Sequence, residues 1–296
     1  MRLPGDNWNM QDCRKRLIFD TSGLNALADD RESLILAKAL GEGFLVRLSE
    51  TNISEVGANP KTERREKLLA LCRRLVHAGE CIIPYHAILV ELAKAHSRNP
   101  ASFRWESVPI RGRNIEAELT HPQYLGTDEA AQDILADFEA NSATFEAVYR
   151  DARPAFDRIF KGKEKKRPTV SELIDMLKNR GAFWKLGMGG YKRACGKDIS
   201  EDGFRAFIDA CPPFNALLLS LCVAEFHRCI KHVRARSDFK AGRLDLFSSV
   251  YLPYCDRFIT NDKGQRNSLA LVAAEAGLIT EVCSLAAFKQ QWLVST

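Results

Sequence analysis

The sequence predicts an α/β fold in which a central parallel sheet is flanked by helices. Apolar runs at residues 17–20, 44–48 and 257–260 are each followed by a helical pattern, and such strand–helix alternation builds parallel sheets. The chain has 296 residues, of which 46% are hydrophobic, which is enough for a full core. It contains no apolar run of 18 or more residues, so we expect no membrane span.

The first hundred residues carry most of this alternation. We expect strands at 17–20 and 44–48 and a third, short one at 81–84. Helical spacing follows each of them, first from Leu24 to Leu40, then at 61–77 and 87–96. Ser49 and Asn52 are favourable residues for the start of a further helix directly after the second strand.

The middle of the chain differs, because it shows helical patches and no convincing strand. The patches span residues 128–140, 144–160, 170–178, 182–195 and 200–210. We therefore predict that residues 101–210 form a mostly helical insertion, and that 1–100 and 211–296 form one discontinuous α/β domain.

The last part of the chain returns to strand–helix alternation. A long apolar helix is expected at 214–233, and a short helix from Asp245 that Pro253 ends, since proline cannot continue a helix. The strand 257–260 follows, then a helix at 264–276, a strand at 278–282 and a final helix at 284–292.

Acidic residues follow two of the predicted strands at the point where each strand ends. Asp20 comes after the first strand and Asp262 after the strand 257–260, and open α/β sheets bind ligands at that edge. Asp245, 17 residues before Asp262, lies on the helix that leads into the same strand. Converging carboxylates repel one another, and a divalent cation is the usual means of offsetting this. The competing interpretation of Asp20 is a helix N-cap.

Composition narrows the class of protein further. Nine cysteines are scattered along the chain without a Cys-x-x-Cys pair, which indicates reduced core residues in a reducing compartment. The first residues lack the apolar core of a signal peptide. We therefore expect a cytoplasmic protein. Its net charge of +5 permits a polyanionic partner without requiring one.

The order of these acids resembles that of the PIN-domain nucleases. The resemblance depends on Leu17–Ser22, on Leu48–Glu55, and above all on Asp245 with Phe258–Asp262. It covers roughly residues 15–98 and 214–292 and leaves out the middle. The resemblance implies a three-layer fold and an Mg²⁺- or Mn²⁺-dependent endoribonuclease whose substrate is RNA. It also implies one of the biological roles known for such proteins. These are the toxin of a toxin–antitoxin pair, which has a protein inhibitor, and enzymes of antiviral defence, RNA processing or RNA decay.

The resemblance also implies a set of site residues. The catalytic and metal-binding acids would be Asp20, Glu55, Asp245 and Asp262. Side chains that could orient them are Thr21, Ser22, Asn25, Asp256, Thr260 and Asn261, although capping and turn formation explain the same residue types. Basic residues that could contact an RNA backbone are Arg111, Arg113, Lys161, Lys163, Lys165, Lys166, Arg167 and Lys263. Solvated charge on a loop is the simpler interpretation of the two basic runs.

Two other functions stay open at this stage. A phosphotransferase with Asp20 as nucleophile, like the haloacid-dehalogenase-like proteins, would need a second aspartate two residues later, where Ser22 stands. A non-catalytic PIN-like module that binds RNA or protein would need no metal. The presence of all four acids favours the nuclease.

Overall fold

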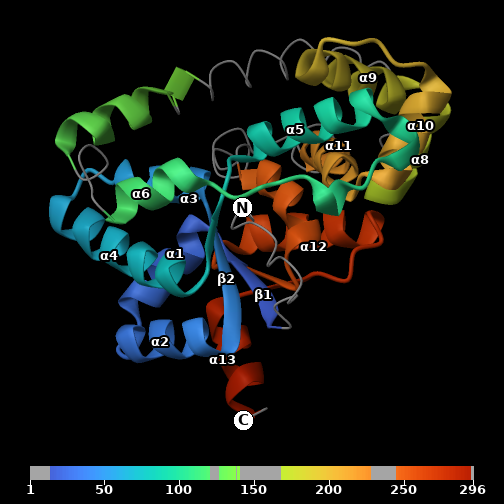
Figure 1. Cartoon of the computed structure of the whole chain (residues 1–296). Coiled ribbons are helices and arrows are strands. Elements are labelled where there is room, and N and C mark those ends of the chain that lie inside the picture. The colour runs from blue at the N-terminus through green and yellow to red at the C-terminus, as the bar shows by residue number, and fades with distance from the viewer. Residues whose placement is uncertain (1–13, 121–126, 138, 141–167, 228–244, 295–296) are drawn as a thin grey trace, which may run out of the picture.

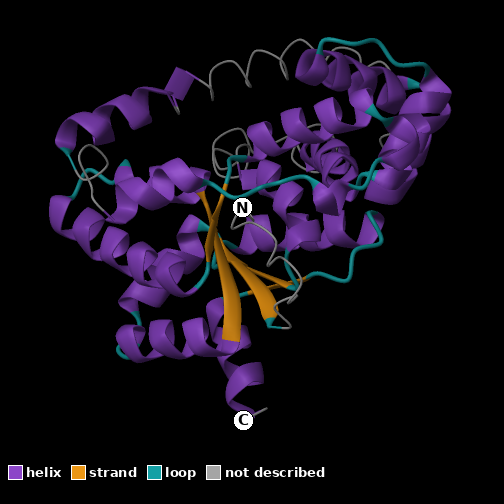
Figure 2. Cartoon of the chain, in the orientation of Figure 1, coloured by secondary structure: helices purple, strands orange, loops and turns teal. Residues whose placement is uncertain are grey.

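Five short strands form one all-parallel sheet at the centre of the computed structural model (Figures 1 and 2). The structure describes residues 14–120, 127–137, 139–140, 168–227 and 245–294. The sheet order is β3-β2-β1-β4-β5, so β1 lies in the middle. The strands are β1 (Lys15–Phe19), β2 (Phe44–Ser49), β3 (Glu80–Ile82), β4 (Arg257–Ile259) and β5 (Glu281–Cys283). The predicted α/β class with a parallel sheet is therefore confirmed.

Alternating side chains on the central strand give the sheet two buried faces. Leu17 and Phe19 point into one hydrophobic cluster and Ile18 into another, and all three side chains are fully buried. Helices from both ends of the chain cover the face of Leu17. They are α1 (Thr21–Asp29), α2 (Ser33–Gly43), α3 (Glu50–Gly57), α4 (Thr62–Ala78) and α13 (Leu285–Val294).

The opposite face, on which Ile18 lies, carries the larger cluster. Its helices include several from the middle of the sequence, and Figure 1 shows them gathered on one side of the sheet. They are α5 (Tyr85–Arg98), α8 (Val170–Asn179), α9 (Ala182–Cys195), α10 (Glu201–Ala210), α11 (Pro212–Glu225), the 3₁₀ helix η4 (Asp245–Tyr254) and α12 (Lys263–Glu275).

The described part of residues 101–210 contains no strand of the sheet. It holds the 3₁₀ turns η1 (Pro100–Ser102) and η2 (Trp105–Ser107), α6 (Arg113–Thr120) and a helical stretch at 128–137. Arg111 forms a single antiparallel bridge with Ile82 of β3. The predicted helices 170–178, 182–195 and 200–210 correspond to α8, α9 and α10, whereas the helix predicted at 144–160 lies outside the described residues. Phe204 and Phe207 of α10 share the cluster of Phe258, so these helices are continuous with the core of the sheet.

Two predicted boundaries were wrong. Pro253 does not end the helix that begins at Asp245, because η4 runs through it to Tyr254. The turn closes without the missing N–H of Pro253, since Cys255 N–H donates to the Leu252 carbonyl at 3.2 Å. The strand predicted at 278–282 is β5, which begins only at Glu281. The Thr280 hydroxyl is bonded instead to the Leu252 and Cys255 carbonyls, at 2.6 and 2.9 Å, and Ile279 is 95% exposed.

The long apolar helix predicted at 214–233 corresponds to α11 (Pro212–Glu225), and residues 228–233 of the prediction lie outside the described part of the chain. Within the described residues no single helix is long and apolar enough to cross a membrane. Among these residues, α10 and α11 together have sufficient length and apolarity, but the pair is bent by 105°. The seven described cysteines form no disulfide with one another, in keeping with the expectation of reduced thiols.

Candidate functional site

The sheet order creates a crevice where the carboxyl ends of β1 and β4 meet. From β1 the chain continues to β2 on one side, whereas β4 and β5 lie on the other side. Connections that leave in opposite directions form the topological switch point at which open α/β sheets bind ligands. Asp20 directly follows β1, and Asp262 follows β4 by three residues. The structure therefore places both predicted aspartates at this point.

Each of these aspartates also caps a helix. Asp20 accepts the Gly23 N–H of α1 at 2.6 Å, and Asp262 accepts the Gln265 N–H of α12 at 2.7 Å. The interpretation of Asp20 as a helix N-cap is thus correct. Asp20 nevertheless also lies at the switch point, so both interpretations hold. A helix N-terminus favours negative charge, so each carboxylate is stabilised where it stands.

Hydroxyl groups hold the Asp20 carboxylate and connect it to the end of β4. Ser22 donates to it at 2.9 Å and Thr260 at 2.7 Å. The same Ser22 oxygen accepts the backbone N–H groups of Asn261 and Asp262, at 2.8 and 3.0 Å. Ser22 therefore fixes the spacing between the two aspartates, which the sequence separates by 242 residues (262 − 20).

Glu55 lies on the wall of the crevice that α3 provides. The Thr21 hydroxyl donates to its carboxylate, and the Asn52 amide approaches Thr21 Oγ1 at 3.4 Å. Ser49, at the end of β2, caps α3 by accepting the Asn52 N–H at 3.1 Å. Three strand ends, those of β1, β2 and β4, thus contribute to one polar surface.

A cavity of about 300 Å³ lies between these elements. Tyr85 and Tyr251 give it an aromatic side, and Tyr85 stacks on Phe247 with ring centroids 5.0 Å apart. Burial raises the pKa of Tyr85, and the negative charge of Glu55 adds to this effect. The cavity is lined by Asp20, Thr21, Ser22, Asn25, Ser49, Thr51, Asn52, Glu55, Tyr85, Ser248, Tyr251, Asp262 and Gln265.

The side chains of this cavity have the chemistry of a hard-cation site. Carboxylate, hydroxyl and amide oxygens are the ligands that Mg²⁺ and Mn²⁺ take. Asp262 Oδ1 accepts the capping bond, whereas Oδ2 accepts no hydrogen bond from the part of the chain that the structure describes. No three His, Cys, Asp or Glu side chains among the described residues stand close enough together to hold a metal ion. The fourth predicted acid, Asp245, begins η4 three residues before Ser248, and its side chain lies outside what is described.

Most of the residues that were predicted to orient the acids are in place. Thr21, Ser22 and Asn25 line the cavity, and Thr260 bonds Asp20. Asn261 has a different role, because its side-chain oxygen accepts the Leu285 N–H of α13 at 3.0 Å.

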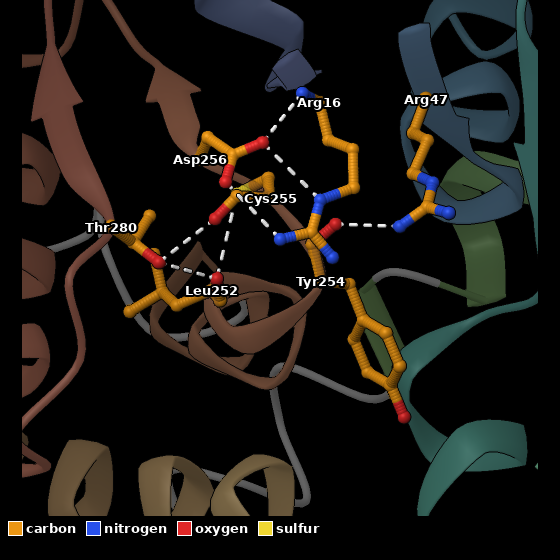
Figure 3. A network of polar contacts seen from close by, with 7 residues as sticks. All are labelled: Arg16, Arg47, Leu252, Tyr254, Cys255, Asp256 and Thr280. Atoms are coloured by element: carbon orange, nitrogen blue, oxygen red, sulfur yellow. Dashed lines mark hydrogen bonds and ion pairs between the residues drawn. The ribbon is translucent and has the colours of Figure 1, made fainter. Parts of the chain in front are cut away.

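Asp256 was wrongly placed in this group, since it lies at the opposite end of β4 (Figure 3). Its carboxylate accepts the backbone N–H of Arg16 at 2.7 Å and the Arg16 guanidinium at 3.1 Å. β4 has only three residues, and Asp256 directly precedes it. Its ion pair ties the amino ends of β1 and β4 together.

The predicted RNA-contacting residues are only partly described. Lys161, Lys163, Lys165, Lys166, Arg167 and the side chain of Arg113 lie outside the described residues. Arg111 is exposed beside the carboxyl end of β3, where Gly112 N–H donates to the Cys81 carbonyl at 2.9 Å. Lys263 is exposed at the first position of α12, next to Asp262.

Sequence reasoning missed several residues that line the cavity. Ser49 had a usable signal, because it follows β2 as Asp20 follows β1. Tyr85, Ser248 and Gln265 had none. The Gln265 side chain links Thr260 to Ser248 of η4, at 2.7 and 3.2 Å, and this bridge depends on how α12 packs on η4.

Comparison with known proteins adds no relative: no family model, no curated protein and no solved structure matches this chain.

Proposed function

We propose that this protein is a PIN-like, Mg²⁺- or Mn²⁺-dependent endoribonuclease. The observation that carries the proposal is the convergence of Asp20, Glu55 and Asp262 on one oxygen-rich cavity at the switch point of a parallel sheet. These residues come from segments far apart in the sequence, so local capping preference does not explain their meeting. The order of the acids along the chain resembles that of PIN-domain nucleases, with Asp245 as the fourth.

The residues of the chain would divide the work as follows. Asp20 and Asp262 would hold the cation, and Glu55 would complete its acidic surroundings. Ser22 and Thr260 keep the Asp20 carboxylate in one orientation. A bound divalent ion supplies a water of lowered pKa and stabilises the charge that develops on the phosphate.

An acidic cavity repels a phosphate backbone, so binding needs basic residues around it. Arg111, Lys263 and the basic run from Lys161 to Arg167 would provide them, with contacts that do not read the RNA sequence. We propose a cytoplasmic location in keeping with the free cysteines. A protein inhibitor would accompany the enzyme if its role is that of a toxin.

A specific observation favours a second candidate, a non-catalytic PIN-like module that binds RNA or protein. Both aspartates are already engaged as N-caps, and the described residues contain no metal-capable group of three acids. In this case the cavity would have no catalytic role, and RNA or protein would bind at another surface of the molecule.

An RNA cleavage assay separates the two candidates. Purified protein is incubated with labelled single-stranded RNA in Mg²⁺, in Mn²⁺ and in EDTA, beside the variants Asp20→Asn and Asp256→Asn. The nuclease predicts cleavage that needs the cation, disappears in Asp20→Asn and persists in Asp256→Asn. Full metal-dependent cleavage by Asp20→Asn would show that Asp20 is not a metal ligand, and binding without cleavage in every condition would establish the non-catalytic module.

A further inference from the structure

A second cavity, of about 510 Å³, lies away from the acidic site. Its walls come from the end of α5, from α9 and α10, and from the loop at 197–199. Figure 1 shows α9 and α10 at the upper right. Tyr85 at the start of α5 lines the acidic cavity, whereas His96, 11 residues later (96 − 85), lines this one. At the rise of an α-helix the two residues are about 16 Å apart. The two cavities are therefore separate.

His96 is the main polar group of this cavity, and its ring is held firmly. The residue is only 7% exposed, and the ring packs against Phe103 and Phe207, with centroids 5.3 and 4.6 Å away. Nδ1 lies 2.9 Å from the Tyr191 hydroxyl. Nε2 forms no hydrogen bond to the described part of the chain, and it is not among the polar atoms sealed from solvent. His96 lines the cavity, and one ring nitrogen of this nearly buried histidine thus has no hydrogen-bond partner among the described residues.

The Tyr191 hydroxyl decides which ring nitrogen carries the proton. Burial raises the pKa of Tyr191 and lowers that of His96, so both groups are neutral near pH 7. Tyr191 is buried, and a buried hydroxyl that donates to nothing costs free energy. The nearby Cys195 sulfur is at most a weak acceptor, and it points its own proton at the Tyr191 backbone carbonyl, at 3.3 Å. Tyr191 therefore donates to Nδ1, which leaves the proton of His96 on Nε2, the nitrogen without a partner in the described residues.

The other lining residues determine which ligand could accept a hydrogen bond from the His96 Nε2–H group. Lys197 lines the cavity and places its ammonium 3.3 Å from the Ser97 carbonyl. Asp198, the one carboxylate among the described lining residues, is paired with Lys192 at 2.9 Å. Ile199, Ala206 and Ala210 make much of the wall apolar. The site thus offers two donors, one of them cationic, beside an apolar chamber.

We propose that this cavity binds a small amphipathic monocarboxylate, whose two oxygens take the His96 Nε2–H and the Lys197 ammonium while its apolar body fills the space between α9 and α10. A carboxylate matches the number and the charge of the donors. The volume is within the usual range of ligand pockets. The proposal does not depend on the ribonuclease activity, because no residue is shared between the cavities.

The test uses octanoate as the probe and octanol as its uncharged match, titrated into the full chain by calorimetry at pH 7. We expect saturable binding of octanoate at one site and binding weaker by about tenfold or more for octanol, since a charge-assisted hydrogen bond is lost. Lys197→Met should weaken octanoate binding by a similar factor. Lys185→Met is the control, because Lys185 is an exposed cationic residue of α9 that does not line the cavity.

A second measurement tests whether His96 contacts the ligand directly or only supports the fold. In long-range ¹H–¹⁵N spectra the His96 ring should show the Nε2–H tautomer in the free protein, and its Nε2–H signal should shift on addition of octanoate. Equal affinity for octanoate and octanol would overturn the proposal. So would unchanged affinity in Lys197→Met, or a His96 signal that octanoate leaves in place.

Discussion

The two edges of the sheet use acidic residues in opposite ways. At the amino edge each carboxylate is paired with an arginine of a neighbouring strand: Asp256 with Arg16, Glu80 with Arg47, and Glu281 with Arg257. At the carboxyl edge the partners seen for Asp20, Glu55 and Asp262 are hydroxyl and backbone N–H groups. Figure 3 shows the first of these pairs, between Arg16 and Asp256.

The difference shows which acids serve the fold and which are available for chemistry. An arginine paired with a carboxylate offsets its charge, and Arg16 also donates to both oxygens of Asp256. Hydroxyl and N–H donors orient a carboxylate but leave its negative charge in the cavity. The three acids at the amino edge therefore stabilise strand pairing, whereas Asp262 at the carboxyl edge forms no ion pair within the described part of the chain and keeps its negative charge.

The largest expected effect comes from exchanging one acid at each edge for its amide. Asparagine caps a helix as well as aspartate does, so Asp262→Asn should leave stability nearly unchanged while lowering kcat for RNA by at least about a hundredfold. Asp256→Asn should do the reverse, with normal kcat and a lower free energy of unfolding. Cleavage kinetics and urea denaturation of both variants provide the comparison, and equal loss of activity in the two would contradict it.

The next effect concerns the arginines of the amino edge. Arg47 donates to the Tyr254 carbonyl at 2.6 Å and to Glu80 at 2.9 Å (the former bond is drawn in Figure 3). Arg47→Met should lower the free energy of unfolding by about 2–3 kcal/mol, because it leaves both acceptors without this donor. Lys38→Met is the control, since the Lys38–Glu42 pair is exposed and its loss should cost less than about 0.5 kcal/mol. Similar costs for the two would mean that the amino-edge pairs are not structural.

A glycine at the carboxyl edge gives a third test. A Cβ on Gly23 would lie 2.5 Å from the Ile259 backbone carbonyl, so only glycine lets the first turn of α1 approach β4 this closely. Gly23→Ala should destabilise the protein by about 1–3 kcal/mol and weaken metal binding by moving Asp20 away from Asp262. Gly189→Ala in α9 meets no atom within 4 Å and should stabilise the protein by about 0.5–1 kcal/mol. Unchanged metal affinity in Gly23→Ala would show that the close contact between α1 and β4 does not determine the geometry of the metal site.

The central part of this site could be predicted from the sequence. Asp20 and Asp262 each follow an apolar strand, and parallel strands end at a common edge, so their convergence follows from the strand assignments alone. Asp256 was misassigned because it precedes a strand of only three residues, and the direction of that strand carries it to the other edge.

The rest of the site depends on packing that no local pattern records. Tyr85 and Gln265 are the first and third residues of their helices, and their sequence neighbourhoods are ordinary. They reach the cavity because α5 and α12 both pack against η4. The sheet order, which creates the switch point, was likewise not readable from strand lengths and spacing.

The smallest effect is a dependence of stability on pH at the amino edge. Burial alone would raise the pKa of Asp256, but the hydrogen bonds and charge of Arg16 outweigh it and hold that pKa below its usual value. A lowered pKa contributes stability above the unfolded-state value near 4, and this contribution disappears as the pH falls through the folded-state value. The difference in unfolding free energy between wild type and Asp256→Asn should therefore shrink below about pH 4. Urea denaturation at successive pH values measures it, and a difference that persists unchanged at about pH 2 would argue against this ion pair.

The most direct test of the account is thermal melting in increasing Mn²⁺, carried out on wild type, Asp262→Asn and Asp256→Asn. A cation that binds only the folded state should raise the Tm of wild type by about 5 °C or more at a hundredfold excess over Kd. The same rise is expected for Asp256→Asn, from a lower starting Tm, and none for Asp262→Asn. Equal stabilisation of Asp262→Asn and wild type would show that the carboxyl-edge acids do not hold the metal.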